Sequence, residues 1–166
     1  MSFEKIDICD IKDSFTSLIR DDWALLTAGK AGDYNTMTVS WGGVGELWGK
    51  DVTFVFVRPQ RYTKEFMEKN DYFSLCFFGE EHKSALRLCG KTSGRDTDKA
   101  QATGLTPAFD GDATYFEQAK LTIICKKIAK QDMDPNGFLD KSIMDCYKAN
   151  DFHTTYVGEI VKVLKK

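Results

Sequence analysis

The chain has 166 residues, of which 42% are hydrophobic and 13% aromatic, so it can bury one sizeable core but is too short for two comfortable domains. We therefore expect a single domain over residues 1–166. Lys and Arg number 23 against 25 Asp and Glu, a net charge of -2. The overall charge thus recruits neither nucleic acid nor an anionic membrane, and any recognition of phosphate must be local.

The N-terminal stretch 1–15 carries acidic residues throughout and has no apolar core of signal-peptide length. No later stretch approaches the continuous apolar run that a membrane span needs. We therefore expect a cytoplasmic protein with no membrane partner.

The five cysteines are an odd number, widely spaced and without a CxxC pair, and the chain has only two histidines. This pattern supports neither a disulfide framework nor a zinc site. Cys76 and Cys125 lie in apolar, strand-like runs, so we expect them to be small, buried hydrophobic residues.

The first predicted strand covers residues 23–28, and the turn-rich segment GKAGDYN follows it. Residues 36–41 then alternate small hydroxylic side chains with larger apolar ones, which is the period of a strand with two differently used faces. We expect the two strands to form a hairpin, in which one face of the second strand packs and the other can donate hydrogen bonds.

A connection with four glycines, residues 42–49, leads to a strongly apolar strand over residues 52–57. The turn after that strand carries Arg58 and Arg61 around Pro59. The hydroxylic strand is therefore followed, one hairpin later, by a cationic corner.

This corner suits the anionic end of a flat, polar ligand. Arginine offers a planar fork of donors that matches phosphate oxygens, and Tyr62 and Thr63 add hydroxyls directly after Arg61. A helix beginning near Thr63 would also favour a phosphate through its free amides and its dipole. The alternative is a surface turn whose arginines are solvated.

Residues 62–70 show apolar side chains near helical spacing and predict a short helix. Residues 71–78 are continuously apolar, as in a strand buried on both faces. Residues 80–88 predict a second short helix. We interpret His82, in the run GEEHKSA, as an exposed helix-surface residue, with a catalytic role as the alternative.

Residues 89–99, CGKTSGRDTDK, form a second candidate anion site. Lys91, Ser93 and Arg95 surround two flexible glycines, so backbone amides, a hydroxyl and two cations could converge on one ligand. The alternative is a charged loop ahead of a charged helix.

The acidic residues of this segment offer two further interpretations. Asp96 is placed as the N-cap of the helix that the run DTDKAQA implies. Arg95 could pair with Asp96 or Asp98 instead of contacting a ligand.

The C-terminal third predicts a loop over 103–113, a strand over 118–129, a turn at 133–137, a helix over 138–149 and a last strand over 153–164. Most gaps are too short for crossover helices, so antiparallel connections should dominate. The expected fold class is mainly β with flanking helices, arranged as a barrel.

Three segments in the same order, NTMTVSWG, RPQRYT and CGKTSGRDTDK, resemble those of the flavin reductase-like, FMN-binding split-barrel family, which includes flavoredoxin. The resemblance runs from about Trp23 to Val163. It implies a Greek-key split β-barrel, FMN as the cofactor, and a homodimer with two flavin sites at its interface.

The resemblance also implies which residues hold FMN. For the isoalloxazine ring and ribityl chain it indicates Asn35, Thr36, Met37 and Thr38, with Ser40 and Trp41 adjoining, for the phosphate Arg58, Arg61, Tyr62 and Thr63, and for the rest of the pocket Lys91 and Ser93. The connection after Trp41 lacks the proline-rich turn common in the family, which leaves the cleft above the flavin undefined. His153 either lies toward the flavin, as a comparable histidine does in the family, or makes a structural hydrogen bond at the strand edge.

A protein of this kind relies on its cofactor, since FMN accepts a hydride and passes on electrons. The sequence shows no catalytic triad, Walker A loop or G-x-G-x-x-G fingerprint, and we predict neither a catalytic side chain nor a metal. Two functions stay open: an FMN-dependent oxidoreductase that uses NADH or NADPH to reduce free flavin or another small acceptor, and a flavoredoxin-type electron carrier between partner proteins. A degenerate member that has lost its cofactor is a third possibility.

Overall fold

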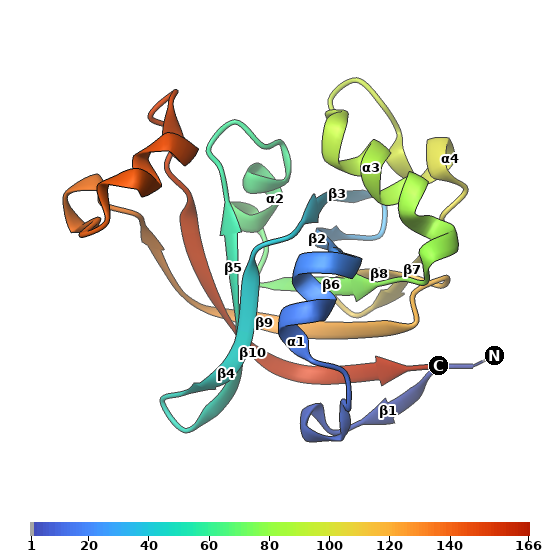
Figure 1. The fold of residues 1–166 in the computed structure, drawn as a ribbon. Helices are drawn as coiled ribbons and strands as arrows, with labels where there is room; N and C mark the ends of the chain where they lie inside the picture. Colours follow the sequence, from blue (N-terminus) through green and yellow to red (C-terminus); the bar gives the residue numbers. More distant parts are fainter. Residues whose placement is uncertain (1) are drawn as a thin grey trace.

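A computed structural model describes residues 2–166 and shows a strongly curled antiparallel sheet with helices around it (Figure 1). In chain order the strands are β1 (Glu4–Ile6), β2 (Ala24–Lys30), β3 (Asp33–Val39), β4 (Gly42–Leu47), β5 (Lys50–Val57), β6 (Tyr72–Phe77), β7 (Pro107–Asp110), β8 (Ala113–Phe116), β9 (Leu121–Asp132) and β10 (Thr154–Lys165). The main sheet has the order β3-β2-β6-β9-β10-β5-β4, with β1 added on β10, and β7 and β8 form a separate hairpin. This arrangement confirms the predicted mainly β class.

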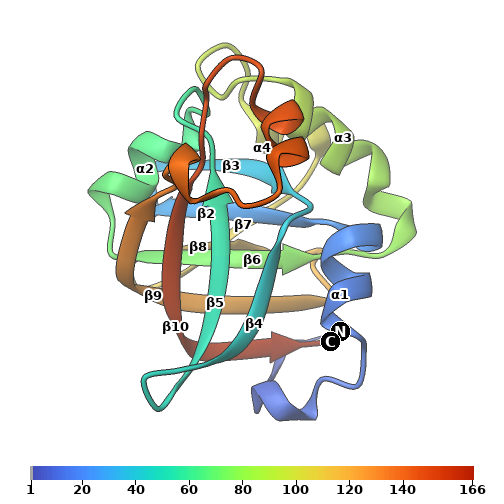
Figure 2. The same cartoon turned by 60° about the vertical axis from the view of Figure 1, so that its left-hand side comes forward.

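The sheet curls because its two longest strands bend. In Figure 2, β2 and β6 run across β4 and β5, and β9 and β10 turn from one direction to the other. The register between β9 and β10 shifts at Val157/Gly158 and again between Ile160 and Lys162, and such bulges bend and twist a strand. A Cβ atom on Gly158 would lie 2.4 Å from the Phe73 ring, so the bend depends on the missing side chain.

The expected hairpin of β2 and β3 is confirmed. The two strands pair from Ala24↔Val39 to Lys30↔Asp33 around a tight turn. Gly29 has a φ of +107°, and a Cβ atom there would lie 2.3 Å from the carbonyl oxygen of Asp33, which only glycine tolerates.

Short helices cover the ends of the curled sheet. The α-helices are α1 (Phe15–Ser17), α2 (Thr63–Lys69), α3 (Lys83–Lys91) and α4 (Lys99–Thr103), the 3-10 helices are η1 (Ile8–Asp10), η3 (Glu80–His82), η4 (Pro135–Gly137) and η5 (Lys141–Tyr147), and η2 (Leu18–Asp22) is a π-helix. Both short helices predicted after β5 and β6 are confirmed. Within residues 2–166, no helix is long and apolar enough to cross a membrane.

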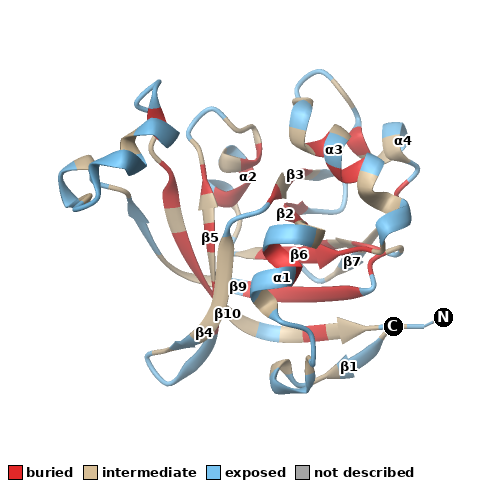
Figure 3. Cartoon of the chain, viewed as in Figure 1, coloured by how far each residue is buried: buried red, intermediate tan, exposed pale blue. Residues whose placement is uncertain are grey.

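The core has two parts. The larger part fills the curled sheet and includes Leu26, Phe73 and Tyr156, and the smaller part lies between the sheet, α3 and the β7–β8 hairpin. The most continuously buried strands are β2, β6 and the first half of β9, and β6 and β9 are plainly red in Figure 3. Cys76 and Cys125 are fully buried, which confirms the prediction of small core residues.

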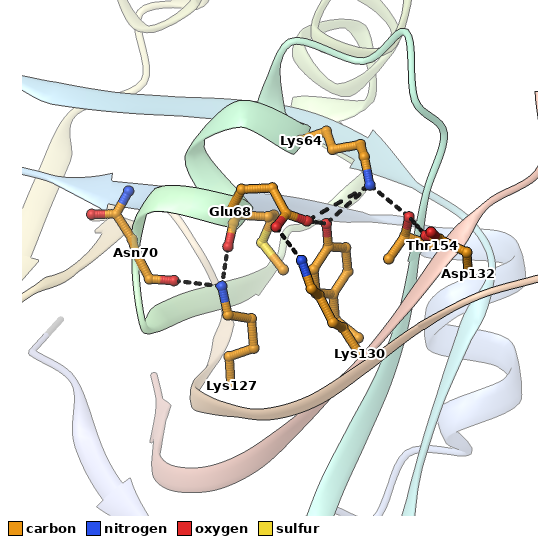
Figure 4. Close-up of polar contacts among 9 residues, drawn as sticks. Lys64, Glu68, Asn70, Lys127, Lys130, Asp132 and Thr154 are labelled. Atoms are coloured by element: carbon orange, nitrogen blue, oxygen red, sulfur yellow. Dashed lines mark hydrogen bonds and ion pairs between the residues drawn. The ribbon is translucent and has the colours of Figure 1, made fainter.

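A polar network attaches α2 to β9 and β10 (Figure 4). The Tyr156 hydroxyl donates to Glu68 at 2.5 Å, and Lys130 forms an ion pair with the same carboxylate. Hydrogen bonds from Lys130 and Tyr156 lower the pKa of Glu68 to about 2. Lys127 donates to the carbonyls of Met67 and Asn70, which satisfies the C-terminal end of α2. The network therefore fixes the helix that follows the cationic corner.

The expectation of a glycine-rich connection over residues 42–49 is wrong. Most of this segment is β4, which pairs with β5 from Gly42↔Val55 to Leu47↔Lys50 and forms an edge of the sheet. Pairing with an apolar neighbouring strand overrides the low strand propensity of glycine. The strand predicted over residues 36–41 is β3, which ends at Val39, so Ser40 and Trp41 lie outside it.

The C-terminal third also differs from expectation. Residues 103–113, predicted as a loop, contain the end of α4 and all of β7, which turns at Gly111 into β8. Residues 138–149, predicted as a helix, contain only the 3-10 helix η5 over Lys141–Tyr147 and no α-helix. The segment buries only Tyr147 and leaves Leu139 96% exposed, which is too little packing to stabilise a short α-helix. The N-cap of α4 is Asp98, which accepts from the Gln101 amide at 3.0 Å, and not Asp96.

Candidate functional site

Two cavities lie at the cationic corner and share Arg61. The first, about 200 Å³, lies between the end of β3, β5 and His153, and we call it the Trp41 cavity. The second, about 170 Å³, lies between the start of α2 and the loop after α3, and we call it the Lys91 cavity.

Two more cavities extend this space. The Arg87 cavity, about 250 Å³, shares Thr38 and Ser40 with the Trp41 cavity. The Asp96 cavity, about 610 Å³, shares Asn35 and Tyr62 with the Lys91 cavity. Neighbouring cavities share lining residues, and we call the four together the trough along β3.

All the residues that the sequence assigned to a cofactor line this trough. They are Asn35, Thr36, Met37, Thr38, Ser40, Trp41, Arg58, Arg61, Tyr62, Thr63, Lys91 and Ser93. The structure therefore brings together side chains from three segments far apart in the sequence, and their assignment to a particular ligand stays a prediction.

The hydroxylic face of β3 is partly engaged within the protein. Asn35 donates to the Thr63 hydroxyl at 2.8 Å, which links β3 to the start of α2. Thr36 shares a hydrogen bond of 2.9 Å with Thr27 of β2, and Thr38 donates to the Leu86 carbonyl. These bonds hold the strand in place, so a ligand would find chiefly the Ser40 hydroxyl and the backbone.

Arg61 is the central cation of the trough. Its guanidinium donates to the Gly90 carbonyl at 2.8 Å, and burial lowers its pKa. Among the described residues, no carboxylate lies within ion-pair distance of Arg61, Lys91 or Lys99. The Lys91 cavity is therefore a site of uncompensated positive charge, which favours an anion.

Arg58 occupies a different position from Arg61. It forms an ion pair with Asp151 at 2.6 Å, donates to the Cys146 carbonyl at 2.9 Å and lies over the Tyr147 ring. The pKa of Asp151 is lowered by hydrogen bonds from Gln60 and Arg58. Arg58 therefore connects β5 to the segment before β10, and much of its charge is balanced there.

Lys99 is a trough residue that the sequence did not single out. It is 6% exposed, and its ammonium donates to the carbonyls of Thr36 at 2.7 Å and Cys89 at 2.9 Å. Burial lowers its pKa to about 8. Its only sequence signal is its place at the end of the CGKTSGRDTDK segment, because nothing local distinguishes a buried lysine from an exposed one.

His153 makes the structural hydrogen bond that was one of the two alternatives raised for it, and its place beside a flavin stays a prediction. It lines the Trp41 cavity, with its ring centroid 5.3 Å from that of Trp41, and its Nδ1 atom is hydrogen bonded to the Tyr147 hydroxyl at 2.8 Å. Burial, followed by the charge of Arg58, lowers its pKa to about 4. The imidazole is therefore neutral near pH 7. His82 packs on Phe78 and lines none of the four cavities.

Arg95 pairs with neither of its two acidic neighbours. It forms an ion pair with Glu65 of α2, and its guanidinium lies 4.4 Å from the centroid of the Tyr62 ring. The tertiary fold supplies this partner, because the loop after α3 lies against α2.

The trough fits a flat, polar ligand with a phosphate at one end. The phosphate would meet Arg61, Lys91 and the Ser93 hydroxyl in the Lys91 cavity. Gly94 packs on Asn35 beside this cavity, where a Cβ atom would lie 2.0 Å from the side-chain amide oxygen of Asn35. FMN has this shape and charge. Within residues 2–166, no group of three or more His, Cys, Asp or Glu side chains is placed to hold a metal ion.

The curled antiparallel sheet with a cationic trough at one end places the protein among the FMN-binding split barrels, as its structural neighbours show. The chain belongs to the flavin reductase-like domain family, whose model matches residues 18–166. The Greek-key split-barrel expectation is therefore confirmed. Comparison with curated proteins found no match.

Solved structures of low sequence identity share the fold. Flavoredoxin from Methanosarcina acetivorans is 21% identical, with 98% of this chain and 76% of that chain covered and a TM-score of 0.69. An FMN-binding protein from Thermus thermophilus with bound p-hydroxybenzaldehyde is 20% identical, with 87% and 71% covered and a TM-score of 0.68. The styrene monooxygenase flavin reductase from Pseudomonas putida S12 is 17% identical, with 86% and 77% covered and a TM-score of 0.62.

Proposed function

We propose that the protein is an FMN-binding oxidoreductase that uses NADH or NADPH to reduce free flavin or another small acceptor. The observation that carries this proposal is the position of Arg61, which lines both the Trp41 and the Lys91 cavity and has no carboxylate partner among residues 2–166. A ligand with its phosphate at Arg61 could extend its planar ring toward Thr38 and Trp41. Family membership and the flavin-binding neighbours support the same cofactor.

In this proposal each wall of the trough has its own task. Asn35, Thr36, Met37 and Thr38 orient the ring and the ribityl chain, and Ser40 and Trp41 border the ring. Arg61, Tyr62 and Thr63 hold the phosphate, with Lys91 and Ser93 opposite them, and Arg58 keeps the segment before β10 against the cavity. Bound FMN would supply the hydride-accepting chemistry, and the chain would supply orientation and a shielded face.

The neutral His153 closes one side of the Trp41 cavity. With a pKa of about 4 it carries no charge near pH 7, so it neither attracts the phosphate nor competes with Arg61. We assign it the role of a wall and hydrogen-bonding group, and we assign no proton transfer to any side chain of the trough.

The second candidate is a flavoredoxin-type electron carrier without a nicotinamide site. Two flavoredoxins among the neighbours favour it, from Methanosarcina acetivorans and from Desulfovibrio vulgaris (Miyazaki F). Such a carrier would hold FMN tightly and exchange electrons with protein partners instead of a small acceptor.

We also propose that the protein acts as a homodimer. β4 forms an edge of the sheet, and the nearby side chains of Trp41 and Trp48 are 48% and 63% exposed, an unusual exposure for indole rings outside an interface. Light scattering should give twice the mass of the 18.8 kDa chain. A monomer with bound FMN would refute the dimer and leave the cofactor assignment intact.

An absorption spectrum of the purified protein, with release of any chromophore, tests the cofactor. Bands of bound flavin identified as FMN are expected, and a protein that stays colourless after incubation with FMN would refute the function. Steady oxidation of NADH or NADPH by the FMN-loaded protein then separates the candidates, because bound flavin without such turnover would favour the electron carrier.

A further inference from the structure

The Arg87 cavity has walls that take no part in the proposed flavin site. Trp23, Leu86 and Arg87 line it, and they line none of the other three cavities of the trough. The cavity measures about 250 Å³. Drug-sized ligands occupy cavities of about 300 to 1,000 Å³, whereas a cavity of about 150 Å³ suffices for benzene. The Arg87 cavity therefore has room for a molecule with a single substituted aromatic ring.

We propose that the Arg87 cavity is a second ligand site, which binds a small aromatic carboxylate beside the flavin ring. In the proposed reaction this ligand is the small acceptor, so the inference rests on the proposed function. Thr38 and Ser40 line both the Arg87 and the Trp41 cavity, and the proposed flavin ring lies against these two residues. A ligand in the Arg87 cavity would therefore lie next to that ring.

The cations of the cavity favour a carboxylate. Arg87 and Lys91 are exposed and lie four residues apart on α3, so they share one side of the helix. Among the described residues, no carboxylate lies within ion-pair distance of either cation. Lys91 also lines the cavity of the proposed phosphate, so Arg87 alone serves the Arg87 cavity. Its guanidinium fork matches the two oxygens of one carboxylate.

The ring of the ligand would meet Trp23, whose indole the protein holds in place. Trp23 has a φ of +64° and a ψ of 168°, a conformation that only glycine adopts without strain. The Lys83 ammonium lies 4.1 Å from the centroid of the indole and donates to the carbonyls of Asp21 and Asp22. Such strain, maintained by surrounding contacts, is typical of ligand sites. Leu86, which is buried, adds an apolar wall.

Binding of benzoate and of the neutral benzamide to the FMN-loaded protein, followed through the visible absorption of the flavin, tests the site. Benzoate should perturb the flavin bands, because it lies beside the ring, and it should bind about tenfold or more tightly than benzamide. R87A should weaken benzoate about fivefold or more and change benzamide by less than about twofold, with R87K between R87A and the wild type.

Two further variants separate the ring contact from the charge. W23L should weaken benzoate and benzamide alike, by about threefold or more, whereas W23F should weaken them less. Both variants should keep the FMN affinity within about twofold of the wild type. K12A removes an exposed lysine that lines none of the four cavities, and it should change neither ligand.

Reoxidation of the FMN-loaded protein, reduced with one equivalent of dithionite in the absence of oxygen, tests the role of the ligand as acceptor. With 4-nitrobenzoate, the two electrons and two hydrogens of the reduced flavin pass to the nitro group, which loses one oxygen as water and becomes a nitroso group. The rate constant for 4-nitrobenzoate should exceed that for the neutral 4-nitrobenzamide by about fivefold or more, and R87A should remove this difference.

The proposal is overturned if R87A leaves benzoate binding unchanged, or if FMN and benzoate exclude each other, because the cavity would then belong to the flavin site. Benzoate binding without a preference for 4-nitrobenzoate in reoxidation refutes the acceptor role. If FMN does not bind the wild type, the proposed function fails. Calorimetric titration of the flavin-free protein with benzoate then tests the site by itself, since R87A should still weaken the binding about fivefold or more.

Discussion

Replacing Arg61 with alanine should weaken FMN binding by about 10- to 150-fold. A charge-assisted hydrogen bond is worth about 1.5 to 3 kcal/mol, and about 1.4 kcal/mol corresponds to a factor of ten. The guanidinium is partly buried, with its pKa lowered for that reason, and it has no ion-pair partner among residues 2–166 to share its charge. The upper part of the range is therefore expected, since a phosphate contact in a partly desolvated site is screened less than one in water.

Fluorescence titration with FMN and riboflavin measures this effect. Riboflavin lacks the phosphate, so its affinity should change by less than about twofold in R61A. R61K keeps the charge and loses the fork that reaches the Gly90 carbonyl, so its loss should be intermediate. R20A, which removes an exposed arginine paired with Asp21, controls for net charge. Equal weakening of FMN and riboflavin in R61A, or unchanged FMN affinity, would refute the phosphate site at Arg61.

Three further predictions concern stability, measured by urea unfolding of the ligand-free protein. His153 has its pKa lowered to about 4, so the folded state disfavours its proton, and stability should fall by roughly 2 kcal/mol as the pH drops from 6.5 toward 4. The H153Q variant should not show this loss of stability at low pH. If the stability of the wild type and of H153Q fell in parallel with pH, the prediction would be wrong. Y156F removes the hydroxyl that donates to Glu68 and should cost about 1.5 to 3 kcal/mol with FMN affinity retained; wild-type stability would show that the network contributes nothing. G158A places a Cβ 2.4 Å from Phe73 and should cost about 1 to 3 kcal/mol, whereas G43A, with no atom within 4 Å of its Cβ, should cost less, and equal losses would exclude overpacking as the cause.

Local pattern was sufficient for most strands. The apolar runs of β2, β5, β6, β9 and β10 and the turn residues between them mark these elements because burial and period leave a signal in the sequence itself. The twelve assigned residues came from three motifs whose order resembles one family, and all of them line one trough. Their types, cations and hydroxyls beside glycines, suit a phosphate ligand, but the residues alone left solvated surface segments as the alternative.

Only the tertiary structure decided which contacts each of those residues makes within the protein. Arg58 and Arg61 look equivalent in the sequence, but Asp151 compensates only Arg58, because the segment before β10 folds back over β5. Lys99 is buried because two carbonyls from β3 and α3 converge on it, and β4 forms because β5 lies beside its glycines. A sequence records propensities and spacing, whereas ion-pair partners, buried donors and shared cavities depend on distances between segments that only the folded chain brings together.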